Sequence, residues 1–346
     1  MDLNRLYRGM RFAFKIFESR LMKKKMPINV YFLVTNRCNL KCFFCYPKVF
    51  DRKIEDLPTE KIFAMIDELV AFGTRYIILE GGEPLLRDDI GEIIDYIKSK
   101  GVVCELITNG FMIKKKINDV IKLDSLCISI EGEEKANDLI RGAGSYARTM
   151  EGINAATSYK IPIRLHATLT RHNYNSLDFL VKLAQGIGAT LTISQPSIHT
   201  EHEALKFSEE ELRSFWRKVR QYKELGYPIG SSFESLDYVI NWPFEYDHIL
   251  RQGTNAPNFR PIQCSLGRLS CNVDADGMVY PCSVLFHKYG LNMLDVGIKK
   301  VWDHFGGLNC ISCGHINQVE QSRIFSGDFK SICNGARYFL KPKRKV

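Results

Sequence analysis

The chain has 346 residues, 45% hydrophobic and 25% charged, which suits one large or two modest globular domains. Its net charge of +9 belongs to the two ends, because residues 1–25 hold eight Lys or Arg and two acids, and residues 337–346 hold five Lys or Arg and no acid. This distribution argues against a nucleic-acid partner, which needs basic side chains on the folded body, and no stretch approaches the roughly 20 apolar residues of a spanning helix.

The first segment, residues 1–26, is predicted to be a basic amphipathic helix, and three lysines follow at Lys23, Lys24 and Lys25. Its apolar residues recur at three- and four-residue steps: Leu3, Leu6, Met10, Phe14, Phe17 and Leu21. Two arrangements fit this pattern. The helix either lies in an anionic membrane interface or packs on the folded domain.

From residue 30 onward, predicted strands and helices alternate, which indicates a parallel sheet covered by helices. The six predicted strands are 30–34, 76–79, 102–107, 125–130, 163–169 and 190–194; the helices are 59–72, 88–99, 114–121, 145–159, 176–185 and 208–225. Residues 27–225 are thus an α/β domain, 226–262 an irregular bridge and 263–346 a smaller C-terminal α+β module. Six units are too few for an eightfold barrel.

Three of the eleven cysteines, Cys38, Cys42 and Cys45, directly follow the first predicted strand. Closely spaced thiolates on one loop suit an iron–sulfur cluster. A structural zinc site usually has four ligands in two pairs, so zinc and three unrelated thiols are the alternatives. Clustered cysteines of this kind favour metal in a reducing compartment, and we expect a cytoplasmic protein, in contact with the membrane surface if the first helix binds lipid.

At these residues the chain resembles the radical S-adenosylmethionine (radical SAM) superfamily, whose signature is C-x3-C-x2-C with an aromatic residue, here Phe44, before the last cysteine. The resemblance implies a partial (β/α)6 barrel and a [4Fe–4S] cluster on Cys38, Cys42 and Cys45. The fourth iron would bind S-adenosylmethionine (SAM), whose reductive cleavage gives a 5′-deoxyadenosyl radical that abstracts hydrogen from substrate. An electron donor such as flavodoxin or ferredoxin is implied as well.

Further segments resemble the SAM-binding motifs of the superfamily. Gly81, Gly82 and Glu83 resemble the G-G-E-P motif that holds the amino group of SAM. Ser129 is implied as a ligand of the ribose or carboxylate, Arg141 of the carboxylate and Thr168 of the ribose. Taken alone, the glycine motif fits a plain turn and Arg141 fits a surface ion pair.

Four later cysteines, Cys264, Cys282, Cys310 and Cys313, resemble the SPASM/twitch modules of radical SAM enzymes, which implies a second, auxiliary [4Fe–4S] cluster. The two further cysteines of the full SPASM pattern would fall where this chain has Val319 and Arg323, so a third cluster is not expected. Two other cysteines, Cys271 and Cys333, are left over, and either could replace one of these four as a cluster ligand. A zinc site built from the same residues is the alternative.

These observations predict a radical SAM oxidoreductase that acts on a lipid or membrane-delivered molecule, because the first helix is basic and amphipathic. Many relatives that modify peptides carry an extra N-terminal peptide-binding domain, and only 37 residues precede Cys38. The alternative is a peptide maturase that oxidises, cross-links or epimerises a side chain, with recognition supplied by a partner protein. The third hypothesis is a non-catalytic iron–sulfur electron carrier.

Overall fold

The computed structural model describes residues 3–47, 49, 52–196, 202–254, 256, 258–328, 330–332 and 334. Its strands are β1 (Asn29–Thr35), β2 (Tyr76–Gly81), β3 (Val103–Thr108), β4 (Ser125–Ser129), β5 (Ile163–Thr168), β6 (Thr190–Ser194), β7 (Ile249–Arg251), β8 (Ser270–Val273), β9 (Met278–Tyr280), β10 (Leu291–Asn292) and β11 (Cys310–Cys313). Its α-helices are α1 (Leu3–Leu21), α2 (Thr59–Phe72), α3 (Ile90–Ser99), α4 (Ile117–Val120), α5 (Glu134–Arg141), α6 (Ser145–Ser158), α7 (Leu177–Gly186), α8 (Glu209–Glu224), α9 (Phe233–Ile240), α10 (Met293–Phe305) and α11 (Ile316–Ser326).

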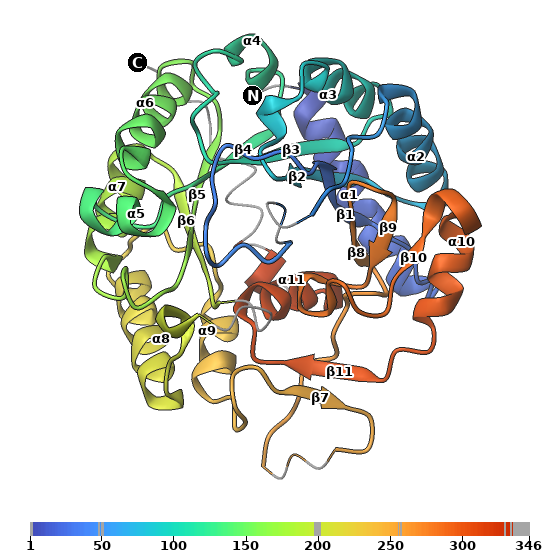
Figure 1. Cartoon of the computed structure of the whole chain (residues 1–346). Helices are drawn as coiled ribbons and strands as arrows, with labels where there is room; N and C mark the ends of the chain where they lie inside the picture. Colours follow the sequence, from blue (N-terminus) through green and yellow to red (C-terminus); the bar gives the residue numbers. More distant parts are fainter. Residues whose placement is uncertain are drawn as a thin grey trace.

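The main sheet has nine strands in the order β10-β9-β8-β1-β2-β3-β4-β5-β6, and β1 to β6 are parallel. Helices surround this curved sheet on its outer side (Figure 1). The central strands are apolar and buried on both faces, as is usual for parallel sheets covered by helices. The predicted α/β fold is therefore confirmed, and β10 and β6 form the two edges of the sheet.

All six predicted strands of the α/β domain are present, with ends that differ by one or two residues. Helix α8 begins with a capping box, in which the Ser208 hydroxyl accepts a hydrogen bond from the Glu211 amide and the Glu211 carboxylate accepts one from the Ser208 amide. Helix α5 has no counterpart among the predicted elements. Residues 226–262, which we expected to be irregular, contain α9 and β7.

The C-terminal hairpin is continuous with the α/β sheet. Strand β8 lies parallel to β1, with Val30 opposite Cys271, and β9 returns antiparallel to β8 after a turn at residues 274–277. The side chain of Arg52, which follows the cysteine loop, donates hydrogen bonds of 2.5 and 3.0 Å to Asp274 in that turn. The module at 263–346 thus shares a sheet with the barrel, and the first cysteine loop is tied to it.

Helix α1 crosses the sheet at the amino ends of the strands. The Arg8 guanidinium forms a buried ion pair with Asp124, just before β4, and Phe12 contacts the ring of Tyr76 at the start of β2 at 5.2 Å between centroids. Arg11 donates to the carbonyls of Lys100 and Gly101 at the end of α3. The helix therefore packs on the domain, although with a face that the apolar pattern did not predict.

The Arg8–Asp124 pair should contribute strongly to stability, because Asp124 would otherwise be a buried carboxylate without its guanidinium partner. We expect Arg8→Ala to lower the free energy of unfolding by about 3 kcal/mol, measured by chemical denaturation. Lys24→Ala, at an exposed position, is the control and should change it little. Equal unfolding free energies for the two variants would contradict this account.

Candidate active site

The first cysteine loop lies against the end of β2 through direct backbone contacts. The amide of Gly82 donates to the Thr35 carbonyl at 2.9 Å, and the amide of Glu83 donates to the Arg37 carbonyl at 2.8 Å. A Cβ atom at Gly82 would lie 2.1 Å from the Arg37 carbonyl oxygen and 3.0 Å from the Cβ of Cys38. The predicted need for glycine is thus explained here by the approach of the cysteine loop itself.

The three cysteines of this loop gather at the mouth of the barrel. Burial raises the pKa of the Cys38 thiol to about 12, and nearby Glu83, Cys42 and Cys45 add smaller contributions in the same direction. All three line one large cavity of about 1140 Å³, together with Phe44. Because they follow the carboxyl end of β1, they occupy the edge of the sheet where parallel α/β proteins place their catalytic groups.

Glu83 is fully buried and is not among the residues that line the cavity. Its carboxylate accepts hydrogen bonds from the Thr108 hydroxyl and the Asn109 amide, both at 2.8 Å, and from the Leu85 amide at 3.1 Å. Burial raises the pKa of Glu83 to about 7, and these hydrogen bonds oppose the shift. In this structure Glu83 joins the ends of β2 and β3 rather than facing a ligand.

Arg141 does line the cavity, at the end of α5. Its Nε and Nη2 donate to Glu131 Oε1 at 2.9 and 2.5 Å, and its guanidinium lies 5.5 Å from the centre of the Phe44 ring. Glu131, whose pKa is raised by burial, also accepts from the Thr168 amide at 2.8 Å. Arg141 therefore forms a buried ion pair that joins the ends of β4 and β5, not the surface ion pair considered as the alternative to a role in binding SAM.

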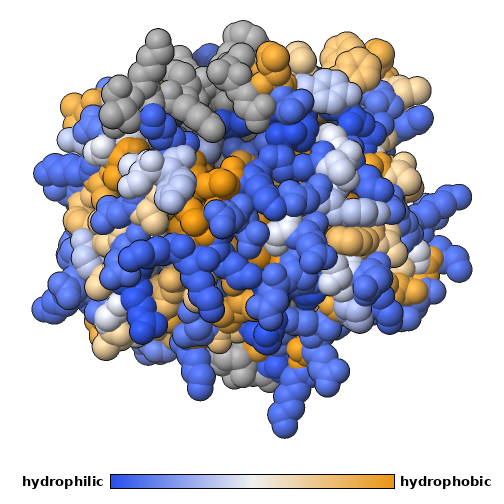
Figure 2. Space-filling model, turned by 90° about the horizontal axis from the view of Figure 1, so that it is seen from above, coloured by the Kyte–Doolittle hydropathy of each residue, from blue (hydrophilic) through white to orange (hydrophobic). Residues whose placement is uncertain are grey.

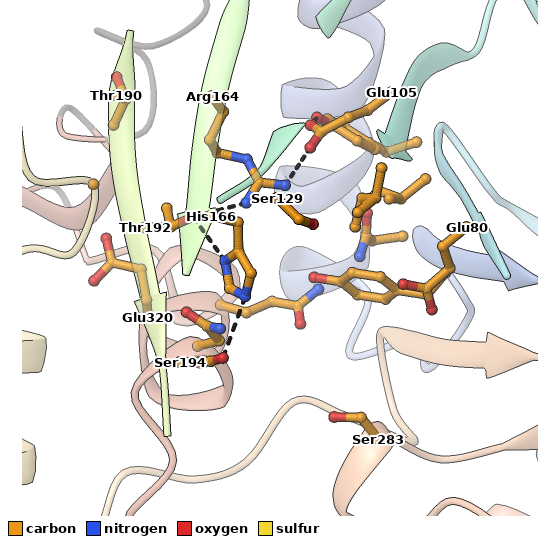
Figure 3. A pocket seen from close by; sticks show the side chains of 18 of the residues that line it. Glu80, Glu105, Ser129, Arg164, His166, Thr190, Thr192, Ser194, Ser283 and Glu320 are labelled. Carbon is orange, nitrogen blue, oxygen red and sulfur yellow. Dashed lines mark hydrogen bonds and ion pairs between the residues drawn. The ribbon is translucent and has the colours of Figure 1, made fainter. Parts of the chain in front are cut away.

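The other predicted SAM ligands lie around the same cavity. Gly81, Gly82, Ser129 and Thr168 all contribute to its wall, and Figure 3 shows Ser129 among the polar side chains that face it. These residues come from the carboxyl ends of β2, β4 and β5. The structure thus brings together every predicted residue of the first site except the side chain of Glu83.

Sequence reasoning missed a group of polar side chains that line the cavity inside the barrel (Figure 3). His166 on β5 contacts the hydroxyls of Thr192 and Ser194 on β6 at 3.0 and 3.2 Å, and Arg164 pairs with Glu105 across the barrel. Burial lowers the pKa of His166 to about 3, so the imidazole is neutral at ordinary pH. The sequence does contain a pattern that indicates this polar face: polar residues recur at every second position of β5 and β6, so they lie on one side of the sheet.

A second missed pair lies directly beside the cysteine loop. The Tyr46 hydroxyl donates to Glu80 Oε1 at 2.6 Å, and the Asn272 amide approaches the same hydroxyl at 3.4 Å. Burial raises the pKa of Glu80 to about 7. Because Asn272 belongs to β8, the C-terminal hairpin contributes directly to the wall of the cavity.

The four C-terminal cysteines also form one group. The Cys264 pKa is lowered to about 7, first by a hydrogen bond with Cys310, and the pKa of Cys282 is raised by burial and then by Cys264. The pKa of Cys313 is raised by burial and by both Cys264 and Cys282. Backbone geometry agrees for three of the four, because the Cys264 amide donates to the carbonyl of Ile311, which lies between Cys310 and Cys313, at 2.7 Å.

Cys271 lies apart from this group. It is fully buried in β8, and burial alone raises the pKa of its thiol. Cys333 lies outside the described residues. In the part of the chain that the structure describes, no three His, Cys, Asp or Glu side chains converge closely enough to share a single metal ion.

The barrel and the C-terminal cysteines are joined through Gln195, just after β6. Its side-chain nitrogen donates to the Gly314 carbonyl, and its side-chain oxygen accepts from the Ile316 amide, both at 2.8 Å. Gln195 also lines the cavity. The second cysteine group is thus attached to the same strand ends that surround the first.

Comparison with known proteins agrees with this arrangement. The profile of the Radical SAM superfamily matches residues 32–184, which include the first cysteine group, Gly81 to Glu83, Ser129, Arg141 and Thr168. Residues 32–184 are a radical SAM domain. The chain's cofactors are accordingly a [4Fe–4S] cluster and SAM, together with the auxiliary cluster typical of SPASM/twitch-type members.

Similarity to individual proteins extends beyond the matched domain. The chain is 28% identical to the mycofactocin maturase MftC of Mycobacterium ulcerans, over 87% of this chain and 85% of that protein. It is 27% identical to the Fe-coproporphyrin III synthase of Methanosarcina barkeri, over 81% and 74%. Its fold is similar to that of Streptococcus suis SuiB, with a TM-score of 0.65, 16% identity and coverage of 84% and 70%.

A methyl group at Gly82 should disturb the first cysteine loop. We expect Gly82→Ala to weaken the hold on iron by about 10- to 100-fold, because the new Cβ collides with the Arg37 carbonyl. Iron per protein after reconstitution measures this. Gly186→Ala is the matched control, since a Cβ there meets nothing within 4 Å, and equal iron content in the two variants would count against the packing argument.

Two cysteines of the C-terminal region, Cys310 and Cys271, should respond differently to substitution. We expect Cys310→Ala to lower the iron content while leaving some SAM cleavage, and Cys271→Ala to leave the iron content unchanged. Iron analysis and the absorption spectrum of each reconstituted variant distinguish them. If Cys271→Ala loses iron and Cys310→Ala does not, Cys271 is the cluster ligand and Cys310 is not.

Proposed function

We propose that this radical SAM enzyme is a maturase that abstracts a hydrogen atom from a side chain of a peptide. The observation that carries the proposal is the similarity to MftC, a maturase, along 87% of this chain, which includes the C-terminal cysteines. The fold shared with SuiB is one that binds both SAM and the precursor peptide SuiA in that protein. The relatives reported above are not named for lipids, so a peptide is preferred to the lipid predicted from the first helix.

The cavity is large enough for this purpose. Pockets for a single small ligand usually have volumes of about 300–1,000 Å³, whereas this one measures about 1140 Å³. It therefore has space for a substrate side chain beside SAM. Its wall combines polar groups on β3, β5 and β6 with apolar ones, which suits a peptide segment that carries both kinds of group.

In this proposal Cys38, Cys42 and Cys45 would hold the cluster, and SAM would bind beside it. When bound, the cluster and SAM supply a 5′-deoxyadenosyl radical after one-electron reduction by a donor such as flavodoxin or ferredoxin. The three thiols and the polar side chains that line the cavity are groups of the kind that such a cluster and SAM require as ligands. The surrounding barrel excludes water and so protects a reactive species.

The other residues of the site position SAM. Arg141 presents positive charge to the SAM carboxylate, while Glu131 fixes the orientation of the guanidinium. Ser129 and Thr168 offer hydroxyl groups to the carboxylate and ribose, and Phe44 provides an apolar face. Glu83 positions the cysteine loop indirectly. Its carboxylate accepts a hydrogen bond from the Asn109 amide, and the Asn109 side chain in turn donates to Asn39 in the cysteine loop at 2.7 Å.

Cys264, Cys282, Cys310 and Cys313 would hold the auxiliary cluster. Four protein thiolates saturate such a cluster, which favours a role in electron transfer or in stabilising the module over direct binding of substrate. Asn272 and Gln195, which line the cavity, are linked to this part of the chain, so the module also shapes the substrate pocket.

Incubation of reconstituted, reduced protein with SAM tests the proposal. We expect 5′-deoxyadenosine from the native chain and none from Cys42→Ala, because two thiolates cannot hold the cluster with an open iron. Cys127→Ala, in the core of β4, is the control and should retain cleavage. Full cleavage by Cys42→Ala would contradict the assignment, and no cleavage by the native chain with full clusters would favour the electron carrier.

The substrate class is tested by adding candidate substrates to the same SAM cleavage reaction. Short precursor peptides encoded beside the gene, Fe-coproporphyrin III and a lipid extract are each added, and the products are analysed by mass spectrometry. We expect a mass change only in a peptide. Conversion of the porphyrin or of a lipid, with no change in any peptide, would replace the maturase proposal with that substrate class.

A further inference from the structure

The apolar stripe of α1 faces away from the protein. Phe14 is 66% exposed, Phe17 61% and Leu21 74%, and the remaining exposed apolar side chains of this surface are Leu3, Tyr7, Met10 and Met22. We call this set of seven side chains the outer stripe. The view of the molecule in Figure 2 is, by contrast, mostly hydrophilic, with hydrophobic side chains scattered among charged ones.

The inward face of α1 is the polar one. Arg8 is buried in its ion pair with Asp124, and Ser19 is also buried. Arg11 donates hydrogen bonds to backbone carbonyls just after the C-terminal end of α3. Only Phe12 and Ile16 supply apolar contacts there, with Phe325 of α11 as a neighbour. These polar anchors hold the helix so that its apolar residues cannot turn toward the core.

A contiguous apolar surface of this size on a stably anchored helix usually marks an interaction site. Its surroundings are basic. Arg20, Lys23, Lys24 and Lys25 are all exposed at its end, and the first 25 residues carry eight Lys or Arg against two acids. The last ten residues of the chain, which lie outside the described ones, add five basic residues and no acid.

We propose that the outer stripe and the lysines after it bind the interface of an anionic lipid bilayer. The apolar side chains would enter the boundary between headgroups and acyl chains while the basic residues meet anionic headgroups. A second copy of this chain is the poorer occupant, because pairing two outer stripes would bring two basic clusters together. This inference does not depend on the peptide substrate proposed above.

Docking in this way fixes the orientation of the active site. Helix α1 lies at the amino ends of β2 to β4, whereas Cys38, Cys42 and Cys45 follow the carboxyl end of β1. The cavity is lined at one end by these cysteines and at the other by inward residues of α1, among them Leu6, Phe12 and Ile16. The cysteine end would therefore face away from the bilayer, accessible to a peptide and to an electron donor.

Vesicle flotation of the reconstituted full chain tests this proposal. The probes are vesicles of phosphatidylcholine alone and of phosphatidylcholine mixed with phosphatidylserine. We expect binding to the anionic vesicles that weakens with added salt, and we expect the triple variant Phe14→Ser, Phe17→Ser, Leu21→Ser to lower the bound fraction by about tenfold or more. None of these three side chains lines the cavity, so solution SAM cleavage should be unchanged.

A double variant, Leu139→Ser with Leu225→Ser, is the matched control, because both leucines are exposed and lie outside α1. It should float as the native chain does, and Lys23→Gln, Lys24→Gln, Lys25→Gln should lose the preference for anionic vesicles. Absence of flotation for the native chain would overturn the proposal. Dimerisation of the native chain that the triple serine variant abolishes, without flotation, would overturn it in favour of self-association.

Discussion

The close approach of two backbone segments, residues 35–38 and 81–83, is the constraint on which the first site depends. Two amide-to-carbonyl hydrogen bonds join them, and the absence of a side chain at Gly82 lets Cys38 come within contact of β2. The cysteine loop contains no regular secondary structure of its own along residues 38–42. Its shape is therefore set by the strand end against which it packs.

Two buried carboxylates extend this arrangement around the barrel. Glu83 links β2 to β3, and Glu131 links β4 to β5 while orienting Arg141. Each gains hydrogen bonds that offset the cost of its burial. The carboxyl ends of two pairs of adjacent strands, around which the groups proposed to bind SAM lie, are thus held together by buried carboxylates.

The sequence predicted the parallel strands well, because a run of apolar residues is buried in such a sheet regardless of which strands pair with it. It did not predict α5, whose eight residues are mostly polar, nor the inverted orientation of α1. Periodicity identifies the apolar face of a helix but not whether that face is covered, which depends here on Asp124 far along the chain. The role of Glu83 was missed for the same reason, since its partners Thr108 and Asn109 are tertiary neighbours.

The central claim is that three thiolates hold a cluster whose remaining iron accepts SAM. Electron paramagnetic resonance of anaerobically reconstituted, reduced protein, recorded with and without SAM, tests it most directly. The account predicts a [4Fe–4S] signal that changes when SAM is added, and loss of that SAM-responsive component in Cys42→Ala. A full cluster signal in the native chain that does not respond to SAM would contradict it.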